Sequence, residues 1–214
     1  MPLKKTIRIT MRLLLIRHGE TDWNNQRRIQ GITDTPLNSC GIEQAHKLAA
    51  RLATESKLET LYTSPLARAR VTAEIIGQKC GLAPVLDERL KEKGLGDLEG
   101  LTAEEFQERY PDLYQGWTTS QDHFPLPNEE SPQQVHDRVQ TFLADLYARH
   151  PKGMHIGVVS HGGTVGMFVG ALIGLKVNQR SPFWFDNASI TLVDLSGSRP
   201  RVRLLNDTCH LNGK

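Results

Sequence analysis

The chain has 214 residues, of which 26 are Lys or Arg and 24 are Asp or Glu, so its formal net charge is only +2. The basic residues are interleaved with acidic ones and form no runs. The sequence therefore lacks the clusters of positive charge that are typical of nucleic-acid-binding proteins. No apolar stretch approaches the ~20 residues that a membrane-spanning helix needs, and the polar start MPLKKTIRIT is unlike a secretory signal, which favours a cytoplasmic protein.

The distribution of residues along the chain favours one domain. No linker rich in Pro, Gly or Ser interrupts it, so a single domain is expected over residues 11–214, preceded at residues 1–10 by a flexible extension or an early start codon. Cys40, Cys80 and Cys209 are odd in number, widely spaced and in no metal-binding pattern. They indicate a reducing compartment and ordinary packing or surface roles.

Short apolar runs alternate with segments of helical periodicity in the first half of the chain. The run MRLLLIR is suited to a strand buried on both faces, and it ends in the polar sequence HGETDWNN, which predicts a functional loop. Gly81 is placed to end a helix. The expected order is a strand at 11–17, a helix at 42–55, a strand at 58–64, a helix at 67–80 and a strand at 83–90.

Residues 101–150 are expected to form a mostly helical insertion beside the sheet. Thr102 with Glu105 has the pattern of a capping box, and Ser131 followed by Pro132 is a typical helix start. Beyond the insertion, HIGVVS predicts a buried strand that enters a glycine-rich helix, and ASITLVDL and RVRLLNDT predict closing strands. This alternation indicates an α/β fold, a three-layer sandwich whose mostly parallel central sheet is flanked by helices.

Two of the most apolar strand candidates each end in a His-Gly pair, His18-Gly19 and His161-Gly162. In open α/β sheets the ligand usually lies beyond the carboxyl ends of the strands. An isolated histidine is more often structural, but two at equivalent strand ends favour a functional site. A histidine nucleophile needs a neutral imidazole with one ring nitrogen free and the other held by an acceptor, which the backbone around Gly19 could supply.

Charged residues near the same strand ends complete a candidate site. Arg17 precedes His18, and Arg68 lies near the start of the helix that follows the second strand. The planar guanidinium group matches the non-bridging oxygens of a phosphoryl group with paired hydrogen bonds, so both arginines could hold one phosphate. Glu92 follows the third expected strand and precedes a glycine-rich stretch, where its carboxyl group could protonate a departing alcohol oxygen.

From Met11 onward the chain resembles the histidine phosphatase superfamily, the phosphoglycerate-mutase-like group. The specific signature is LLLIRHGETDWN, and IQGITDTPLNSCG, SPLARARVTAE, LKEKGLGDLEG and VVSHGG follow in the expected order. The resemblance implies hydrolysis of a small phosphorylated metabolite through a phosphohistidine, without a metal or an organic cofactor. It makes His18 the phosphorylated nucleophile, Arg17, Arg68 and His161 the ligands of the phosphoryl oxygens, and Glu92 the proton donor.

The resemblance also implies further residues around the phosphate. Asn24 is expected in the phosphate pocket itself. Thr21, Gln30, Gly31 and the backbone near Gly162 are expected to orient the phosphate or the substrate.

Residues after the acid and near the chain end bear on the substrate. Mutases of the superfamily usually have a histidine and a tyrosine directly after the acid, whereas Lys93 and Gly94 stand here, which favours hydrolysis. FWFDNASITLVDL and LLNDTCHLNG are similar to the metal-independent phosphoserine phosphatases, so L-phosphoserine is the best single substrate. Some of those enzymes bind substrate with a histidine where this chain has Leu95, and His210 is a candidate pocket residue instead.

Other readings stay open to different degrees. A broad-specificity, α-ribazole-phosphate or sugar-phosphate phosphatase and a phosphoglycerate mutase would differ in residues 101–130, where Trp117, His123 and Phe124 belong to either a lid or a packed connection.

Other classes of protein fit the sequence less well. A metal-dependent hydrolase is disfavoured because the sequence has no HxH or HExxH spacing, and a serine hydrolase built on Ser160 is disfavoured because the sequence has no G-x-S-x-G elbow. A catalytically inactive binding module is disfavoured, because such a protein would have lost the catalytic residues that this chain retains. Dimerisation is common among relatives, and a homodimer remains an open expectation.

Overall fold

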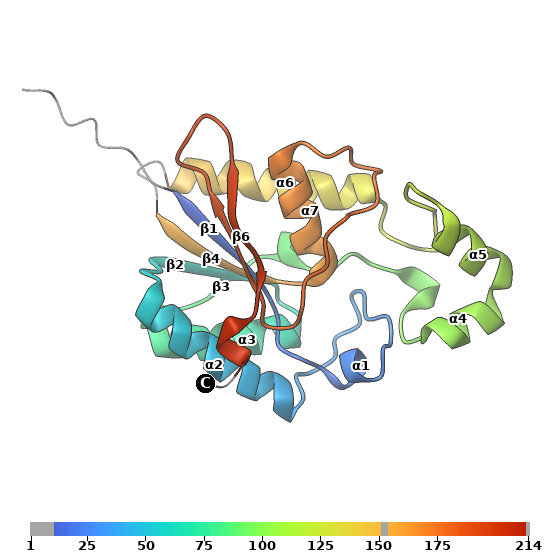
Figure 1. The fold of residues 1–214 in the computed structure, drawn as a ribbon, viewed down its shortest axis with the longest axis horizontal. Coiled ribbons are helices and arrows are strands. Elements are labelled where there is room, and N and C mark those ends of the chain that lie inside the picture. Colours follow the sequence, from blue (N-terminus) through green and yellow to red (C-terminus); the bar gives the residue numbers. More distant parts are fainter. Residues whose placement is uncertain (1–10, 151–153, 213–214) are drawn as a thin grey trace, which may run out of the picture.

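The computed structural model describes residues 11–150 and 154–212, so the extension expected at residues 1–10 lies outside the described part. The described residues form a six-stranded sheet with helices on both faces (Figure 1). The strands are β1 (Arg12–Arg17), β2 (Thr60–Thr63), β3 (Val85–Leu86), β4 (His155–Ser160), β5 (Ile190–Asp194) and β6 (Arg201–Asp207).

The strand order is β3-β2-β4-β1-β5-β6. The pairs β1–β4, β2–β4 and β2–β3 are parallel, whereas β5 pairs antiparallel with β1 and with β6. In the β1–β4 pair, Arg17 lies opposite Ser160. The carboxyl ends of these two central strands therefore meet at one edge of a mostly parallel sheet, which confirms the expected fold class.

The helices form two outer layers. In Figure 1, α6 and α7 cover one face of the sheet, and α2 and α3 cover the other. None of the helices in residues 11–150 and 154–212 is long and apolar enough to span a membrane. The helices are α1 (Asp22–Asn25), α2 (Ser39–Glu55), α3 (Ala67–Cys80), α4 (Ala103–Arg109), α5 (Pro111–Thr119), α6 (Pro132–Arg149) and α7 (Gly162–Ile173), and the short 3₁₀ turns are Glu88–Leu90, Gly96–Leu98 and Cys209–Leu211.

The packing of strand β1 on both of its faces explains why its sequence is continuously apolar. Leu13 and Leu15 pack into the cluster shared with α6 and α7, whereas Leu14 and Ile16 pack into the cluster shared with α2 and α3. Because successive side chains point to opposite faces of a strand, a strand covered on both faces needs apolar residues at every position. Burying each of these side chains contributes about 1.5–3 kcal/mol relative to exposure.

Two expected boundaries were wrong. The helix expected at 42–55 begins at Ser39, because the Asn38 side chain caps it by accepting a hydrogen bond from the backbone of Gly41 at 2.8 Å. The strand expected at 83–90 is reduced to β3, because the Asp87 side chain accepts from the backbone of Arg89 and starts a 3₁₀ turn there.

The expected insertion is shorter than predicted. Helix α6 lies on the sheet and belongs to the main core, because Val139 and Phe142 pack against the strands. The segment that stands apart comprises α4, α5 and the connection to α6, which Figure 1 shows at the side of the sandwich. It packs around its own apolar cluster, whose buried residues are Leu98, Phe106 and Leu126.

Two glycines allow the first turn of α2 to contact the loop after β1. A Cβ atom at Gly41 would lie 2.1 Å from the carbonyl oxygen of Glu20, and one at Gly19 would lie 2.4 Å from the carbonyl oxygen of Gly41. Both obstacles are backbone atoms, which cannot rotate away. The loop that follows β1 is therefore held against α2 by backbone proximity.

We expect Gly41→Ala to lower the free energy of unfolding by about 1–3 kcal/mol, the usual effect of overpacking. Urea unfolding followed by circular dichroism would measure it. Gly197→Ala is the matched control, because a Cβ atom there meets nothing closer than 3.7 Å. Equal stability of the two variants would contradict the close backbone packing.

Candidate active site

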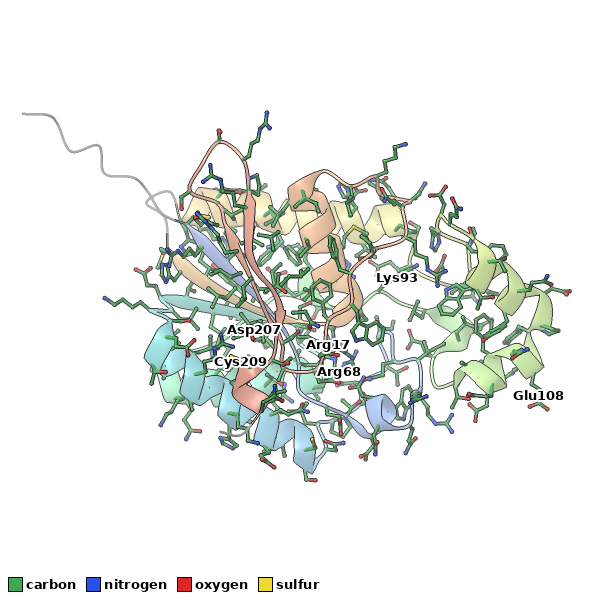
Figure 2. All side chains as sticks on the ribbon, viewed as in Figure 1. Arg17, Arg68, Lys93, Glu108, Asp207 and Cys209 are labelled. Carbon is green, nitrogen blue, oxygen red and sulfur yellow. The ribbon has the colours of Figure 1, made fainter. Side chains whose placement is uncertain are left out.

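A cavity of about 730 Å³ opens beyond the carboxyl ends of β1 and β4. Its inner end is basic, and Figure 2 shows Arg17 and Arg68 close together near the centre of the molecule. Its lining also includes apolar residues, among them Ile29, Phe183 and Trp184. The residues predicted from the sequence that line the cavity are Arg17, His18, Asn24, Gln30, Gly31, Arg68, Glu92 and Gly162.

His18 lies directly after β1 and is only 3% exposed. Its Nδ1 lies 2.6 Å from the carbonyl oxygen of Gly19. Because a carbonyl oxygen can only accept, Nδ1 carries the ring hydrogen and Nε2 keeps its lone pair. Burial lowers the pKa of His18 well below its ordinary value, and the charges of Arg17 and Arg68 lower it further. The imidazole is therefore neutral and has one free nitrogen.

His161 is the N-cap residue of α7 and lies beside His18, with the ring centroids 5.1 Å apart. Its Nδ1 accepts a hydrogen bond from Nε of Arg68 at 3.2 Å, so its Nε2 carries the hydrogen and donates to Oγ of Ser64 at 2.8 Å. Burial lowers the pKa of His161 well below its ordinary value, and Arg68 adds to this effect. Both rings are neutral.

Arg68 is fully buried near the start of α3. Besides His161, it donates to the carbonyl oxygens of Thr33 and Gly31, each at 2.7 Å. Burial lowers the pKa of Arg68, although Glu92 opposes this change. Three of its five N–H groups are used in these bonds, so the guanidinium is fixed in place while two N–H groups remain for a ligand.

Arg17 ends β1 and donates through Nη1 to the carbonyl oxygen of Phe185. Its Nε is buried and has no hydrogen-bond partner among the residues that the structure describes. Burial lowers the pKa of Arg17, and the carboxylates of Glu92 and Asp186 oppose this. A buried donor without a partner costs about 1–3 kcal/mol, and an anionic oxygen in the cavity would satisfy it.

Glu92 lies against the N-terminus of α7. Its two carboxyl oxygens accept from the backbone of Lys93 at 2.8 Å, of Gly163 at 2.9 Å and of Thr164 at 3.0 Å. A Cβ atom at Gly163 would lie 2.7 Å from Oε1 of Glu92, so glycine permits this close approach. The unpaired N–H groups of a helix N-terminus favour such an acceptor. The carboxyl group is thus fixed at the side of the cavity.

Thr21 was expected to contact the phosphate or substrate, but it does not line the cavity. It is fully buried and caps α1, where its Oγ1 accepts from the backbone of Asn24 at 3.1 Å. The Oδ1 of Asn24 in turn accepts from Nδ2 of Asn187, which also lies 3.2 Å from the carbonyl oxygens of His18 and Gly19. Thr21 therefore orders the loop that carries Asn24.

Sequence reasoning missed Asn187 and Ser64. Asn187 follows FWFD and precedes β5, which pairs with β1. Its position near a central strand could have identified it as a candidate site residue. Ser64 follows β2 directly, and the same rule about carboxyl ends of parallel strands that selected His18 and His161 applies to it. In residues 11–150 and 154–212, no three His, Cys, Asp or Glu side chains are grouped so that they could hold a metal ion.

The expectation that His210 lines the site was wrong. Its Nδ1 lies 3.3 Å from Nη1 of Arg51 on α2, and it does not line the cavity. The reason is an ion pair between Arg51 and Asp207 at 2.6 Å, which holds the end of β6 and the turn after it against α2. Burial lowers the pKa of His210.

Comparison with known proteins agrees with this geometry. The model of the histidine phosphatase superfamily (branch 1) matches residues 13–208. The metal-independent phosphoserine phosphatase of Arabidopsis thaliana is 35% identical over 203 residues, which cover 94% of this chain and 83% of that protein. The crystal structure of a phosphoserine phosphatase mutant from Entamoeba histolytica in complex with phosphoserine has a TM-score of 0.81 at 30% identity, covering 94% and 99% of the two chains.

A solved structure of another specificity is equally similar in fold. The mycobacterial glucosyl-3-phosphoglycerate phosphatase in complex with VO3 has a TM-score of 0.83 at 31% identity, covering 92% of this chain and 99% of that chain. The fold is therefore shared by enzymes that are named for different substrates.

The two buried imidazoles make stability depend on pH. In the folded chain their pKa values lie well below the ordinary value, whereas in the unfolded chain both histidines take up protons below about pH 6.5. The unfolded state then binds more protons, so the free energy of unfolding falls as the pH decreases below 6.5, by up to about 1.4 kcal/mol per pH unit for each group. Urea unfolding between pH 7.5 and 5 would measure this slope.

The slope is expected to become shallower in His161→Gln and to persist in His46→Gln, where the histidine is exposed on α2. If both variants kept the slope of the original chain, His161 would not be buried in its neutral form.

Proposed function

Because the chain belongs to the histidine phosphatase superfamily and its phosphoserine phosphatase relatives support a phosphoric monoester hydrolase, we propose that it forms a phosphohistidine on His18 and that L-phosphoserine is its substrate. The state of His18 carries the mechanistic part of the proposal. Its ring is neutral, Nδ1 is held by the Gly19 carbonyl oxygen, and Nε2 has a free lone pair beside two guanidinium groups. These are the requirements for a histidine nucleophile.

In the first step, Nε2 of His18 attacks phosphorus and the bond from phosphorus to the alcohol oxygen breaks. Negative charge on the three non-bridging oxygens is stabilised by Arg17, whose Nε lacks a protein partner among the described residues, and by the two free N–H groups of Arg68. Glu92 gives a proton to the departing alcohol oxygen, so the alcohol leaves as serine.

In the second step, water attacks the phosphorus of the phosphohistidine. The carboxylate of Glu92, now without its proton, takes a proton from that water, and the bond between Nε2 and phosphorus breaks. Inorganic phosphate is released, and both His18 and Glu92 return to their initial states. The hydrogen bonds from the start of α7 keep the Glu92 carboxyl group in place through both proton transfers.

The choice of L-phosphoserine is supported by the relatives and by the mouth of the cavity. The Arabidopsis and Entamoeba proteins are named phosphoserine phosphatases. The serine part of the substrate carries both a carboxylate and an ammonium group. Arg27 and Asp186 both line the cavity, so groups of both required charges are available there, whereas Arg28 is paired with Glu105 at 2.6 Å.

We expect His18→Ala to reduce phosphate release from L-phosphoserine by at least about 10³-fold, because removing a catalytic nucleophile has effects of this size or larger. The assay is run with a chelator present. His46→Ala, which removes an exposed histidine, is the matched control and keeps full activity. Acid-labile ³²P trapped on the original chain and absent from His18→Ala would identify the intermediate, and a fully active His18→Ala protein would exclude it.

Substrate preference is tested with L-phosphoserine, 3-phosphoglycerate, α-ribazole phosphate, a sugar phosphate and ethyl phosphate. The highest kcat/KM is expected for L-phosphoserine. Arg27→Ala is expected to raise KM for L-phosphoserine about tenfold, the effect of losing one hydrogen bond to a charged group, and to leave KM for ethyl phosphate within about twofold. Equal kcat/KM values for all esters would contradict the assignment of L-phosphoserine.

A further inference from the structure

A second cavity, of about 210 Å³, adjoins the one that contains His18. It lies between α6, α7, the loop at 175–181 and the segment that contains α5. Gly163, Gly166 and Ser181 line both cavities, so the two are neighbours along α7. The apolar side chains that line the second cavity include Trp117, Phe124, Val135, Met167, Leu175 and Val177.

The walls of this second cavity are held together by contacts between segments distant in the sequence. The backbone of His123 donates to the carbonyl oxygen of Asn178 at 2.8 Å, and Nη1 of Arg180 donates to the carbonyl oxygen of Trp117 at 2.9 Å. The guanidinium group of Arg180 also lies 4.9 Å from the ring centroid of Trp117. The shape of the cavity is therefore formed before a ligand arrives, which reduces the ordering that binding requires.

Two polar residues that line the second cavity, Lys93 and His123, already have a common partner in Glu129. Glu129, whose side chain is 6% exposed, accepts from Nζ of Lys93 at 2.7 Å and lies 2.6 Å from Nε2 of His123. Lys93 directly follows Glu92, and Figure 2 shows it between α7 and the segment with α4 and α5. Lys93 is thus paired, and the other charged residues that line the cavity, Asp122, Lys176 and Arg180, are exposed to solvent, so an apolar group there leaves no buried charge unpaired.

Size and position indicate what the second cavity can hold. A dry cavity of about 150 Å³ is large enough for benzene, so 210 Å³ accommodates a single ring or a short alkyl chain. The backbone of Gly163 donates to Glu92, the proposed proton donor to the alcohol oxygen. An alcohol that leaves next to Glu92 therefore begins beside Gly163, and a longer alcohol extends along Gly166 into the apolar walls.

We propose that the second cavity binds the apolar part of a substrate's alcohol, and that the enzyme hydrolyses primary phosphate monoesters with a hydrophobic chain or ring. This inference rests on the phosphohistidine chemistry proposed above and is independent of the choice of L-phosphoserine. Trp117 and Phe124 then determine specificity at a distance from the reacting phosphorus.

The test uses ethyl, butyl, hexyl and 4-phenylbutyl phosphate, with L-phosphoserine as the reference. Once the alkyl chain of the substrate reaches the second cavity, kcat/KM is expected to rise about fourfold for each added methylene group, as the burial of apolar surface predicts. Phosphate release from L-phosphoserine with no increase along the series would overturn this inference and leave the proposed function standing. No release from any ester would overturn both.

Substitutions in the wall of the second cavity test whether the apolar group of the substrate binds there. Val177→Trp fills the cavity from the 175–181 loop, and we expect it to lower the ratio of kcat/KM for hexyl to that for ethyl phosphate at least about tenfold, whereas Val177→Ala keeps most of that ratio. Val202→Trp, at an exposed position on β6, is a control for introducing tryptophan elsewhere. A ratio that is unchanged in Val177→Trp while the protein remains folded by circular dichroism would place the apolar group outside this cavity.

Discussion

The parallel pairing of β1 with β4, with Arg17 opposite Ser160, places His18 and His161 side by side at one edge of the sheet. Burying two imidazoles next to two guanidinium groups would be costly if all four carried charge. The arrangement is stable because both rings are neutral and Arg68 donates to two carbonyl oxygens and to His161. Because Nδ1 of His18 is held by the Gly19 carbonyl oxygen, its Nε2 is free for phosphoryl transfer, and the two guanidinium groups supply positive charge for the phosphoryl oxygens.

The central strands and the inner part of the site could be predicted because their signals are local. A strand buried on both faces is apolar at every position, and the polar residues directly after it lie where a parallel sheet binds its ligand. This reasoning located His18, His161 and Arg17, and the helix start after β2 located Arg68. Asn187 was not predicted, since its three hydrogen bonds around the loop after His18 depend on the antiparallel pairing of β5 with β1.

The errors have two causes, one tertiary and one local. His210 turns away from the cavity because Arg51 and Asp207, which are 156 residues apart, form an ion pair. The strand expected at 83–90 ends early because the side chain of Asp87 competes for the backbone of Arg89. Neither Arg51 nor Asp207 is recognisable as a partner from its own neighbourhood in the sequence, whereas the contact between Asp87 and Arg89 is local. Residues 101–130 proved to be a packed segment that also forms a wall of the second cavity.

The apolar cluster of α4 and α5 has a consequence for how this enzyme can diverge. Leu98, Phe106 and Leu126 are separate from the two clusters that hold the sheet and its helices together. Changes in this segment repack a small satellite core and leave the strands that carry His18 and His161 in register. Selection can therefore exchange one alcohol pocket for another while the phosphoryl-transfer centre is inherited unchanged, and one catalytic scaffold can give rise to enzymes for many metabolites.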